Sequence, residues 1–180
     1  MTRRQLILAN FLAFQVGWLL CVLAGAGRWH WAGSLLIGVM VAFHLWGAKQ
    51  FRAECQLIVL ALLIGLGWDS LLVTLGLLQY EHGLVNSNMA PHWIIALWAL
   101  FASTLNVSLR WLKDRWLVAT MFGAIGGPLA YWGGAKLGAV TIPDQTLALL
   151  TLTIGWAVMT PALVLLSKRF DGFPHLERSR

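Results

Sequence analysis

The stretch LALLIGLGWDSLLVTLGLL, residues 60–78, decides the fold class of this chain. A helix needs roughly 20 apolar residues to cross the hydrocarbon layer of a bilayer, which is about 30 Å thick, and this stretch has that length and character. One of its side chains is ionisable, Asp69. The stretch therefore predicts a transmembrane helix. It also supplies the first candidate functional residue, because carboxylates inside such helices are rare and commonly functional.

The composition extends this reading to the whole chain. Of its 180 residues, 59% are hydrophobic and 11% are charged, whereas a soluble domain has about 45–50% and about 25%. The apolar runs are too long and too uniform for barrel strands, and a helix satisfies its own backbone groups in lipid. We therefore predict an all-α polytopic membrane bundle, formed as one domain over residues 1–180. The six expected spans are residues 6–24, 31–48, 55–78, 92–110, 116–136 and 146–167.

The basic residues predict how the chain is threaded. With six spans, eleven of the 13 Lys and Arg residues fall on the side that holds both termini, and Arg28 and Lys136 fall on the other. Positive loops stay in the cytoplasm, so we expect cytoplasmic termini and a cytoplasmic tail at 168–180. The net charge of +6 then indicates contact with anionic phospholipid headgroups rather than with nucleic acid. The eleven residues are Arg3, Arg4, Lys49, Arg52, Arg110, Lys113, Arg115, Lys168, Arg169, Arg178 and Arg180.

The first apolar run has an alternative interpretation. Its basic start, MTRRQ, and the later Ala24-Gly25-Ala26 resemble a cleavable secretory signal. The run from Leu6 is long enough to span a bilayer and five more spans follow it, so we expect it to be retained in the membrane.

Asp69 is the deepest acidic residue of the predicted bundle. It lies 14 residues into the span 55–78, at or just beyond the midplane, where an ionised group costs about 2.5–3.5 kcal/mol. No Lys or Arg occurs at that depth, so its partners must be uncharged, and we place Gln15, Tyr131 and Trp68 with it in a candidate intramembrane site. Burial without a counter-charge favours the neutral carboxyl, so we expect Asp69 to donate a hydrogen bond. Such a carboxyl group could carry a proton in a proton-coupled carrier. Alternatively, it could hold neighbouring helices together by hydrogen bonding.

A second polar layer is predicted near the cytoplasmic face. Asn10, His44 and Asn106 each lie about four residues inside their spans, roughly 6 Å below the boundary. Polar side chains turn away from lipid, so a shared cytoplasmic-side pocket is one interpretation, with Glu54 and Arg110 just above it. Such a pocket could hold a headgroup or transfer a proton. Ordinary hydrogen bonding between helices is the alternative.

No metal or cofactor site is predicted. Glu81, His82 and His92 share one outer loop, but their spacing fits no standard metal site. Cys21 and Cys55 lie at opposite ends of their spans, beyond the reach of a disulfide.

The span 116–136 contains glycines at four- and seven-residue spacing. Together with Gly138 just beyond the span, Gly123, Gly127 and Gly134 build a face that a neighbouring helix can approach closely. Pro128 interrupts the backbone hydrogen bonding of this span. A kink there would open a cavity beside Tyr131, and close helix packing is the alternative.

Several short motifs also resemble a known family. They are Asn10-Phe11 with Gln15 and Trp18, Gly67-Trp68-Asp69, Pro91-His92-Trp93, Leu97-Trp98, Phe101-Ala102, Gly127-Pro128-Leu129-Ala130-Tyr131 and Gly138-Ala139. Together they resemble the small bacterial inner-membrane proteins catalogued as domain of unknown function 2878. The resemblance implies a multi-pass protein of the bacterial inner membrane. It also implies a setting in lipid handling, since genes of this family are often found beside enzymes that modify unsaturated acyl chains of phospholipids. The family assigns no catalytic residue.

Three functions are compatible with these features. The first is a noncatalytic lipid-associated or accessory protein, whose partner is a second copy of itself or a lipid-modifying enzyme. The second is a small proton-coupled transporter that uses Asp69. The third is an intramembrane lipid enzyme that uses the layer around His44. We favour them in that order, because an enzyme would need a nucleophile or a metal cluster that the sequence does not supply.

Overall fold

The computed structural model describes residues 2–27 and 29–176, and it shows six α-helices in that part of the chain. Three of the basic residues used to predict the threading lie outside the described residues: Arg28, Arg178 and Arg180. The end of the expected cytoplasmic tail, which holds Arg178 and Arg180, therefore also lies outside them. Two short 3₁₀ helices follow α4 and α6, at Arg110–Leu112 and Pro174–Leu176. The α-helices are α1 (Arg3–Gly25), α2 (His30–Gly47), α3 (Phe51–Thr74), α4 (His92–Leu105), α5 (Trp116–Lys136) and α6 (Gln145–Arg169).

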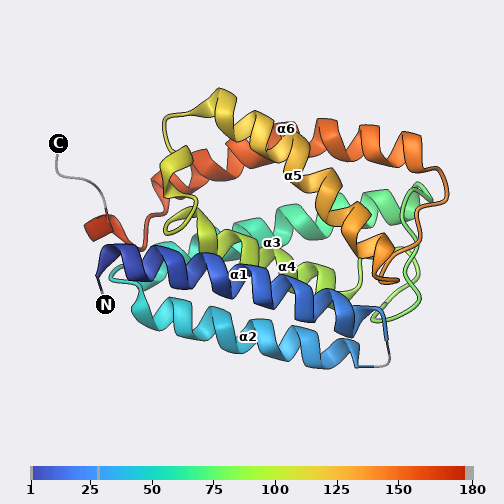
Figure 1. Cartoon of the computed structure of the whole chain (residues 1–180), viewed down its shortest axis with the longest axis horizontal. Helices are drawn as coiled ribbons and strands as arrows, with labels where there is room; N and C mark the ends of the chain where they lie inside the picture. The colour runs from blue at the N-terminus through green and yellow to red at the C-terminus, as the bar shows by residue number, and fades with distance from the viewer. Residues whose placement is uncertain (1, 28, 177–180) are drawn as a thin grey trace.

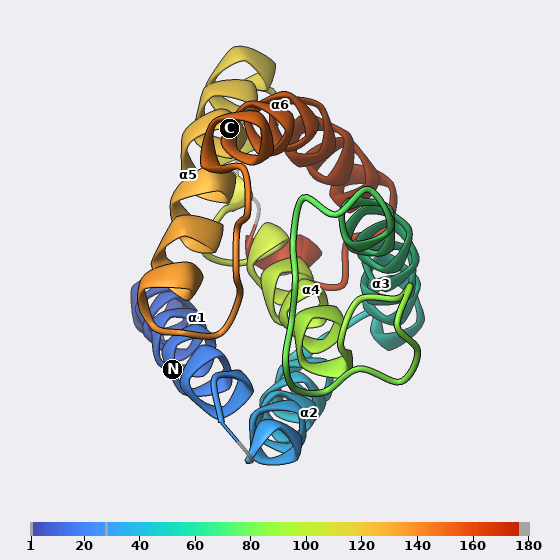
Figure 2. The same ribbon diagram turned by 90° about the vertical axis from the view of Figure 1, so that its right-hand side faces the viewer.

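The helices run side by side between two ends of the molecule (Figure 1). Seen along the bundle, α4 occupies the centre and the other five helices surround it (Figure 2). Ten of the 14 residues of α4 are buried, so this helix forms the core. At 1.5 Å per residue α4 is only about 21 Å long, and the loop 75–91 covers the end at which it starts.

The all-α fold of the prediction is confirmed, and the chain has the helices of a membrane protein. Four helices, α1, α2, α3 and α6, are long and apolar enough to cross a membrane. The helix α4 is shorter, and α5 is not among the four although it has 21 residues. Its glycines and Pro128 lower its hydropathy.

Two expected spans end in the wrong place. The span 55–78 is shifted, because α3 begins at Phe51 and stops at Thr74, where Gly76 takes a left-handed conformation with φ 72° and closes the helix.

The span 92–110 is too long. The hydroxyls of Ser103 and Thr104 donate to the carbonyls of Leu100 and Phe101 at 2.7 and 2.6 Å, and α4 ends directly afterwards at Leu105. Such local bonds compete with the helical pattern.

The bundle consists of two parts. The helices α1 to α4 pack on one another, whereas α5 packs mainly along α6 and shares few contacts with α1. Glycines make the α5–α6 contact possible, as expected from their spacing. A Cβ on Gly123 would lie 2.2 Å from the carbonyl oxygen of Trp156, and a Cβ on Gly127 would lie 2.2 Å from its ring. No side chain larger than hydrogen fits at either position without a shift.

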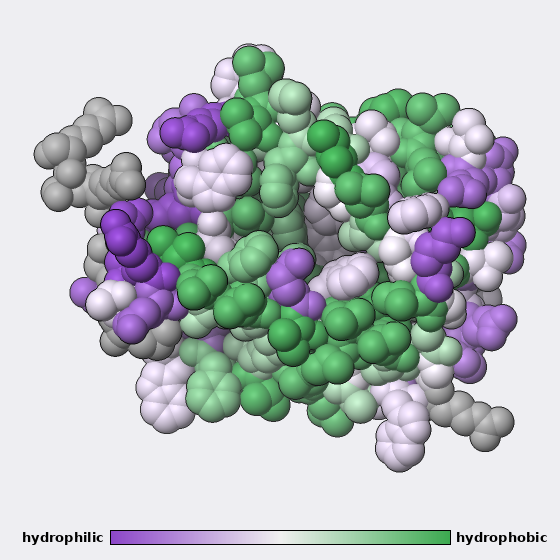
Figure 3. Space-filling view, in the orientation of Figure 1, coloured by the Kyte–Doolittle hydropathy of each residue, from purple (hydrophilic) through white to green (hydrophobic). Residues whose placement is uncertain are grey.

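Charge is concentrated at the two ends of the bundle. The middle of the surface is hydrophobic and the hydrophilic residues gather at either end (Figure 3), as in a protein that sits across a bilayer. We call the end that holds both described termini the basic end. Of the described Lys and Arg residues, Lys136 alone belongs to the opposite end, and those of the basic end are Arg3, Arg4, Lys49, Arg52, Arg110, Lys113, Arg115, Lys168 and Arg169.

Candidate functional site

Asp69 is fully buried at the point where α3, α4 and α5 meet. The indole N–H of Trp98 donates to its Oδ2 at 2.6 Å, and the hydroxyl of Tyr131 donates to its Oδ1 at 2.6 Å. Trp98 belongs to α4 and Tyr131 to α5, so one carboxyl group connects three helices. Both of its oxygens have a partner, which is how a buried polar group avoids a large desolvation cost.

The candidate intramembrane site of the prediction is only partly assembled. Tyr131 contacts Asp69 as expected, but Gln15 and Trp68 do not. The ring of Trp68 packs on Gly155 of α6 instead, and its Nε1 has no hydrogen-bond partner among the described residues. Gln15 does not contact Asp69 because the two residues lie at different depths in the bundle. Gln15 lies about 18 Å from the start of α1, whereas Asp69 lies about 27 Å from the start of α3.

Trp98 is the partner that sequence reasoning missed. Asp69 lies five residues before the end of α3, and Trp98 lies six residues after the start of α4, so both are about 8–9 Å from the same end of the bundle. The equal depth of Asp69 and Trp98 could have identified Trp98 as a partner from the sequence. The expected span of 55–78 concealed it, because it placed Asp69 nearer to the midplane.

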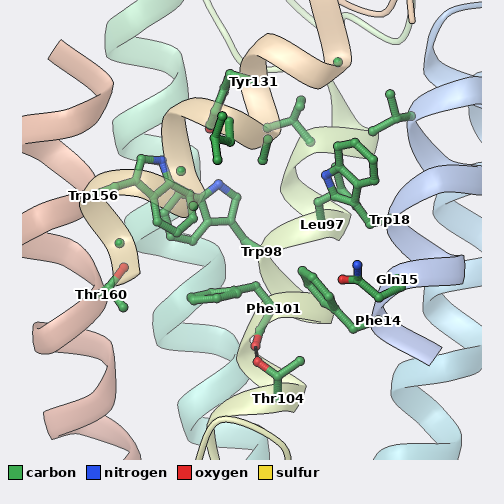
Figure 4. Close-up of a pocket in the computed structure, with 18 of the residues that line it drawn as sticks. Phe14, Gln15, Trp18, Leu97, Trp98, Phe101, Thr104, Tyr131, Trp156 and Thr160 are labelled. Atoms are coloured by element: carbon green, nitrogen blue, oxygen red, sulfur yellow. Dashed lines mark hydrogen bonds between the residues drawn. The ribbon is translucent and has the colours of Figure 1, made fainter. Parts of the chain in front are cut away.

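A cavity of about 380 Å³ lies between the two parts of the bundle, with walls from α1, α4, α5 and α6. Aromatic rings form much of the wall (Figure 4). Those of Trp98 and Trp156 stack at 4.8 Å between centroids, and the ring of Phe101 meets Trp156 edge-on at 5.4 Å. Trp98 and Tyr131 therefore line the cavity while their polar atoms bind Asp69 behind the wall. The cavity beside Tyr131 that the sequence suggested is present.

The cavity is open between α1 and α5. The lining residues Phe11, Phe122 and Leu129 come from these two helices and are 48%, 39% and 57% exposed. Gly126 of α5 also lines the cavity, and a Cβ added there would meet nothing within 4 Å. The hollow between α5 and α1 can be seen in Figure 3. Because this opening lies in the apolar middle of the surface, it faces the region that lipid chains would occupy.

A separate polar network occupies the basic end. Nε2 of His44 lies 2.7 Å from Oε1 of Glu54, which is fully buried. The side-chain amide of Asn106 and the backbone N–H of Gly172 donate to Oε2 of Glu54 at 2.8 and 2.9 Å. The structure thus joins His44 and Asn106 of the predicted layer, through a carboxylate that the sequence placed at the interface.

Asn10, the third member of the predicted layer, belongs to another set of bonds. Its amide donates to the carbonyl of Ser103 at 3.1 Å, and its Oδ1 accepts from the hydroxyl of Ser108 at 2.6 Å. No bond connects Asn10 with His44 or Asn106 among the described residues. The three side chains share a depth but not a single set of contacts.

The network of the basic end also attaches the segment after α6. The guanidinium of Arg110 donates to both oxygens of Asp171, and Nζ of Lys113 lies 3.1 Å from Oδ2. Burial acts to raise the pKa of Asp171, but the Arg110 hydrogen bond and the Lys113 charge outweigh it, so the pKa is lowered. Burial lowers the pKa of Lys113, against the opposing charge of Asp171. These contacts stabilise the ends of α4 and α6 against each other.

Histidines meet at the opposite end. Nδ1 of His30 lies 2.9 Å from Nε2 of His92, whose Nδ1 lies 2.7 Å from the hydroxyl of Ser34. The sequence drew attention to His82 and His92 but not to His30. In the described part of the chain, no group of three or more His, Cys, Asp or Glu side chains is arranged to hold a metal ion.

Comparisons with known proteins give one match. A sequence model of the family described as "Protein of unknown function (DUF2878)" matches residues 7–162. No curated protein and no solved structure matches the chain. The matched range includes Asp69, Trp98, Tyr131 and every residue that lines the cavity. Since it covers most of the chain, the resemblance inferred from the motifs is confirmed, and the protein belongs to the DUF2878 family.

Proposed function

We propose that this protein is a noncatalytic lipid-associated protein of the bacterial inner membrane, and that the cavity holds the apolar chain of a lipid. In this account all six helices lie in the bilayer, with the basic end in the cytoplasm among anionic headgroups. The lipid chain enters from the side, between α1 and α5.

The aromatic cavity is the observation that carries this proposal. Its volume of about 380 Å³ lies within the range of about 300–1,000 Å³ typical of ligand sites. Its walls are apolar and its opening lies between two helices in the hydrophobic middle of the surface. A chain that leaves the bilayer for this cavity exchanges one apolar environment for another and gains contacts with the rings.

Asp69 has a supporting role in this proposal. It binds Trp98 and Tyr131 from behind, and so it fixes two rings of the wall. A proton-coupled transporter is less well supported, because both oxygens of Asp69 are engaged and the two rings separate it from the cavity. An enzyme built on His44 is less well supported, because the other partners of Glu54 are an amide and a backbone N–H rather than a nucleophile.

The test uses two glycines that differ in one respect. Gly126 and Gly67 lie within helices and are exposed, and a Cβ at either meets nothing within 4 Å, but only Gly126 lines the cavity. We expect Gly126→Phe to fill part of the cavity and Gly67→Phe to leave it open. Native mass spectrometry of each protein, purified in mild detergent, counts the bound lipid.

The proposal predicts bound lipid on the wild type and on Gly67→Phe, with a strong reduction on Gly126→Phe. Equal lipid on all three proteins would contradict it, because the lipid would then bind elsewhere on the surface. Asp69→Asn is expected to retain the lipid, since asparagine keeps a partner for each ring.

A further inference from the structure

We propose that the occupant of the cavity is an uncharged lipid whose chain carries an oxygen atom, as an ester, ketone or hydroxyl group, and that the amide of Gln15 recognises this oxygen. The inference rests on the proposed function and specifies the chemical class of the ligand.

Gln15 is the first observation. It lies near the middle of α1, it lines the cavity, and its side chain lies beside Phe14 and Trp18 (Figure 4). Its amide makes no hydrogen bond to any residue in the described part of the chain. The side chain is exposed rather than enclosed, and in a bilayer an amide without a partner at this depth is costly, because neither lipid chains nor aromatic rings replace its hydrogen bonds with water. A ligand oxygen would accept a bond from its NH₂ group.

Three further polar atoms of the wall are also without partners. The hydroxyl of Tyr80, Oγ1 of Thr160 and the indole Nε1 of Trp156 are buried, and none has a hydrogen-bond partner among the described residues. Buried polar groups are nearly always bonded in folded proteins, so each such exception needs an explanation. Hydroxyl groups can donate to an ester or ketone and can also accept from a ligand hydroxyl.

The charge of the wall restricts the ligand. No Lys, Arg, His, Asp or Glu lines the cavity in the described residues, and the carboxyl of Asp69 lies behind Trp98 and Tyr131. A carboxylate or phosphate inside the cavity would lack a counter-charge at a large cost. The polar group that meets Gln15 is therefore uncharged.

Depth restricts the ligand further. Gln15 is about 18 Å from the start of α1, and half of the hydrocarbon layer is about 15 Å. A phospholipid that keeps its headgroup at the interface would present only hydrocarbon at this depth. The oxygen that meets Gln15 belongs either to the interior of a chain or to a lipid with no charged headgroup to hold it at the surface.

Three probes of equal chain length test this inference on the purified full-length protein. They are a long-chain ketone with its carbonyl at mid-chain, the corresponding alkane and the corresponding fatty acid. Each competes with a diazirine-bearing ketone for photo-cross-linking in detergent. Gln15→Leu removes the amide, and the matched control is Gln56→Leu, which changes an exposed glutamine of α3 that does not line the cavity.

We expect the ketone to compete about 2- to 12-fold better than the alkane on the wild type, the range given by one net hydrogen bond. Gln56→Leu should keep this preference and Gln15→Leu should lose it, while the fatty acid competes worst at neutral pH. Equal competition by ketone and alkane on the wild type, or a preference that survives in Gln15→Leu, would overturn the inference and leave the cavity as a site for plain chains. If no probe competes, the proposed function fails with it.

A second measurement addresses the unbound protein. Because the amide of Gln15 has no partner without ligand, Gln15→Leu is expected to raise the melting temperature of delipidated protein. A lower melting temperature would show that Gln15 has a structural partner, and the recognition role would then be rejected.

Discussion

Replacing Asp69 by Asn and by Leu separates its hydrogen bonding from its charge. Asparagine offers one acceptor and one NH₂ group, so its oxygen can accept from the indole of Trp98 while its NH₂ donates to the hydroxyl of Tyr131. Leucine can do neither and leaves both partners unpaired. Measured hydrogen bonds between membrane helices average about 0.6 kcal/mol and reach about 1.7 kcal/mol, so the loss of two corresponds to about 1–3 kcal/mol.

The assay is reversible unfolding in mixed micelles, with the free energy of unfolding followed through tryptophan fluorescence. We expect Asp69→Asn to unfold close to wild type, Asp69→Leu to lose about 1–3 kcal/mol, and Tyr131→Phe, which removes one of the two bonds, to lose about half as much. The reasoning is refuted if Asp69→Leu is as stable as wild type or more stable. The carboxyl would then be maintained at a cost to stability, and proton-coupled transport would become the better explanation.

Two further predictions concern the close contact between helices and the basic end. Gly127→Ala is expected to destabilise the protein by about 1–3 kcal/mol, because its Cβ would meet the ring of Trp156. The neighbouring Gly126→Ala should have little effect, because its Cβ meets nothing within 4 Å. Similar free energies of unfolding for both variants would contradict this prediction. Because the pKa of Asp171 is lowered in the folded protein, its contribution is present above the unfolded pKa of about 3.9 and is lost as the pH falls through the folded value. The stability difference between wild type and Asp171→Asn should therefore be full at about pH 6 and shrink towards about pH 3, and a difference that grows on acidification would contradict the sign.

Helix positions were predictable wherever apolar runs are bounded by charge or by bulky interfacial residues. The span 116–136 coincides with α5, whose limits are Trp116 and Lys136. The errors at α3 and α4 arose from local backbone choices, a left-handed Gly76 and the hydroxyl bonds of Ser103 and Thr104, which a hydropathy pattern does not record. Sequence periods describe which residues are apolar but not where the backbone stops being helical.

The candidate sites were less predictable, because they depend on how helices are placed. Depth along each helix correctly joined Tyr131 to Asp69, but depth alone cannot say which residue at a given level faces which neighbour. The same argument grouped Asn10 with His44, which the structure separates. The glycines and Pro128 of α5 suggested a cavity beside Tyr131, but the walls that α1, α4 and α6 contribute depend on tertiary packing that the sequence of α5 does not record.

The most direct test of the account is to map where lipid contacts the protein. Cells supplied with a diazirine-bearing fatty acid incorporate it into their acyl lipids, and irradiation followed by peptide mass spectrometry identifies the cross-linked residues. We expect labelling of the cavity-lining residues of α4, such as the half-buried Leu97 and the buried Phe101, in wild type and Gly67→Phe, and its loss in Gly126→Phe. Labelling confined to the outer faces of the helices in all three proteins would show that no lipid chain occupies the cavity.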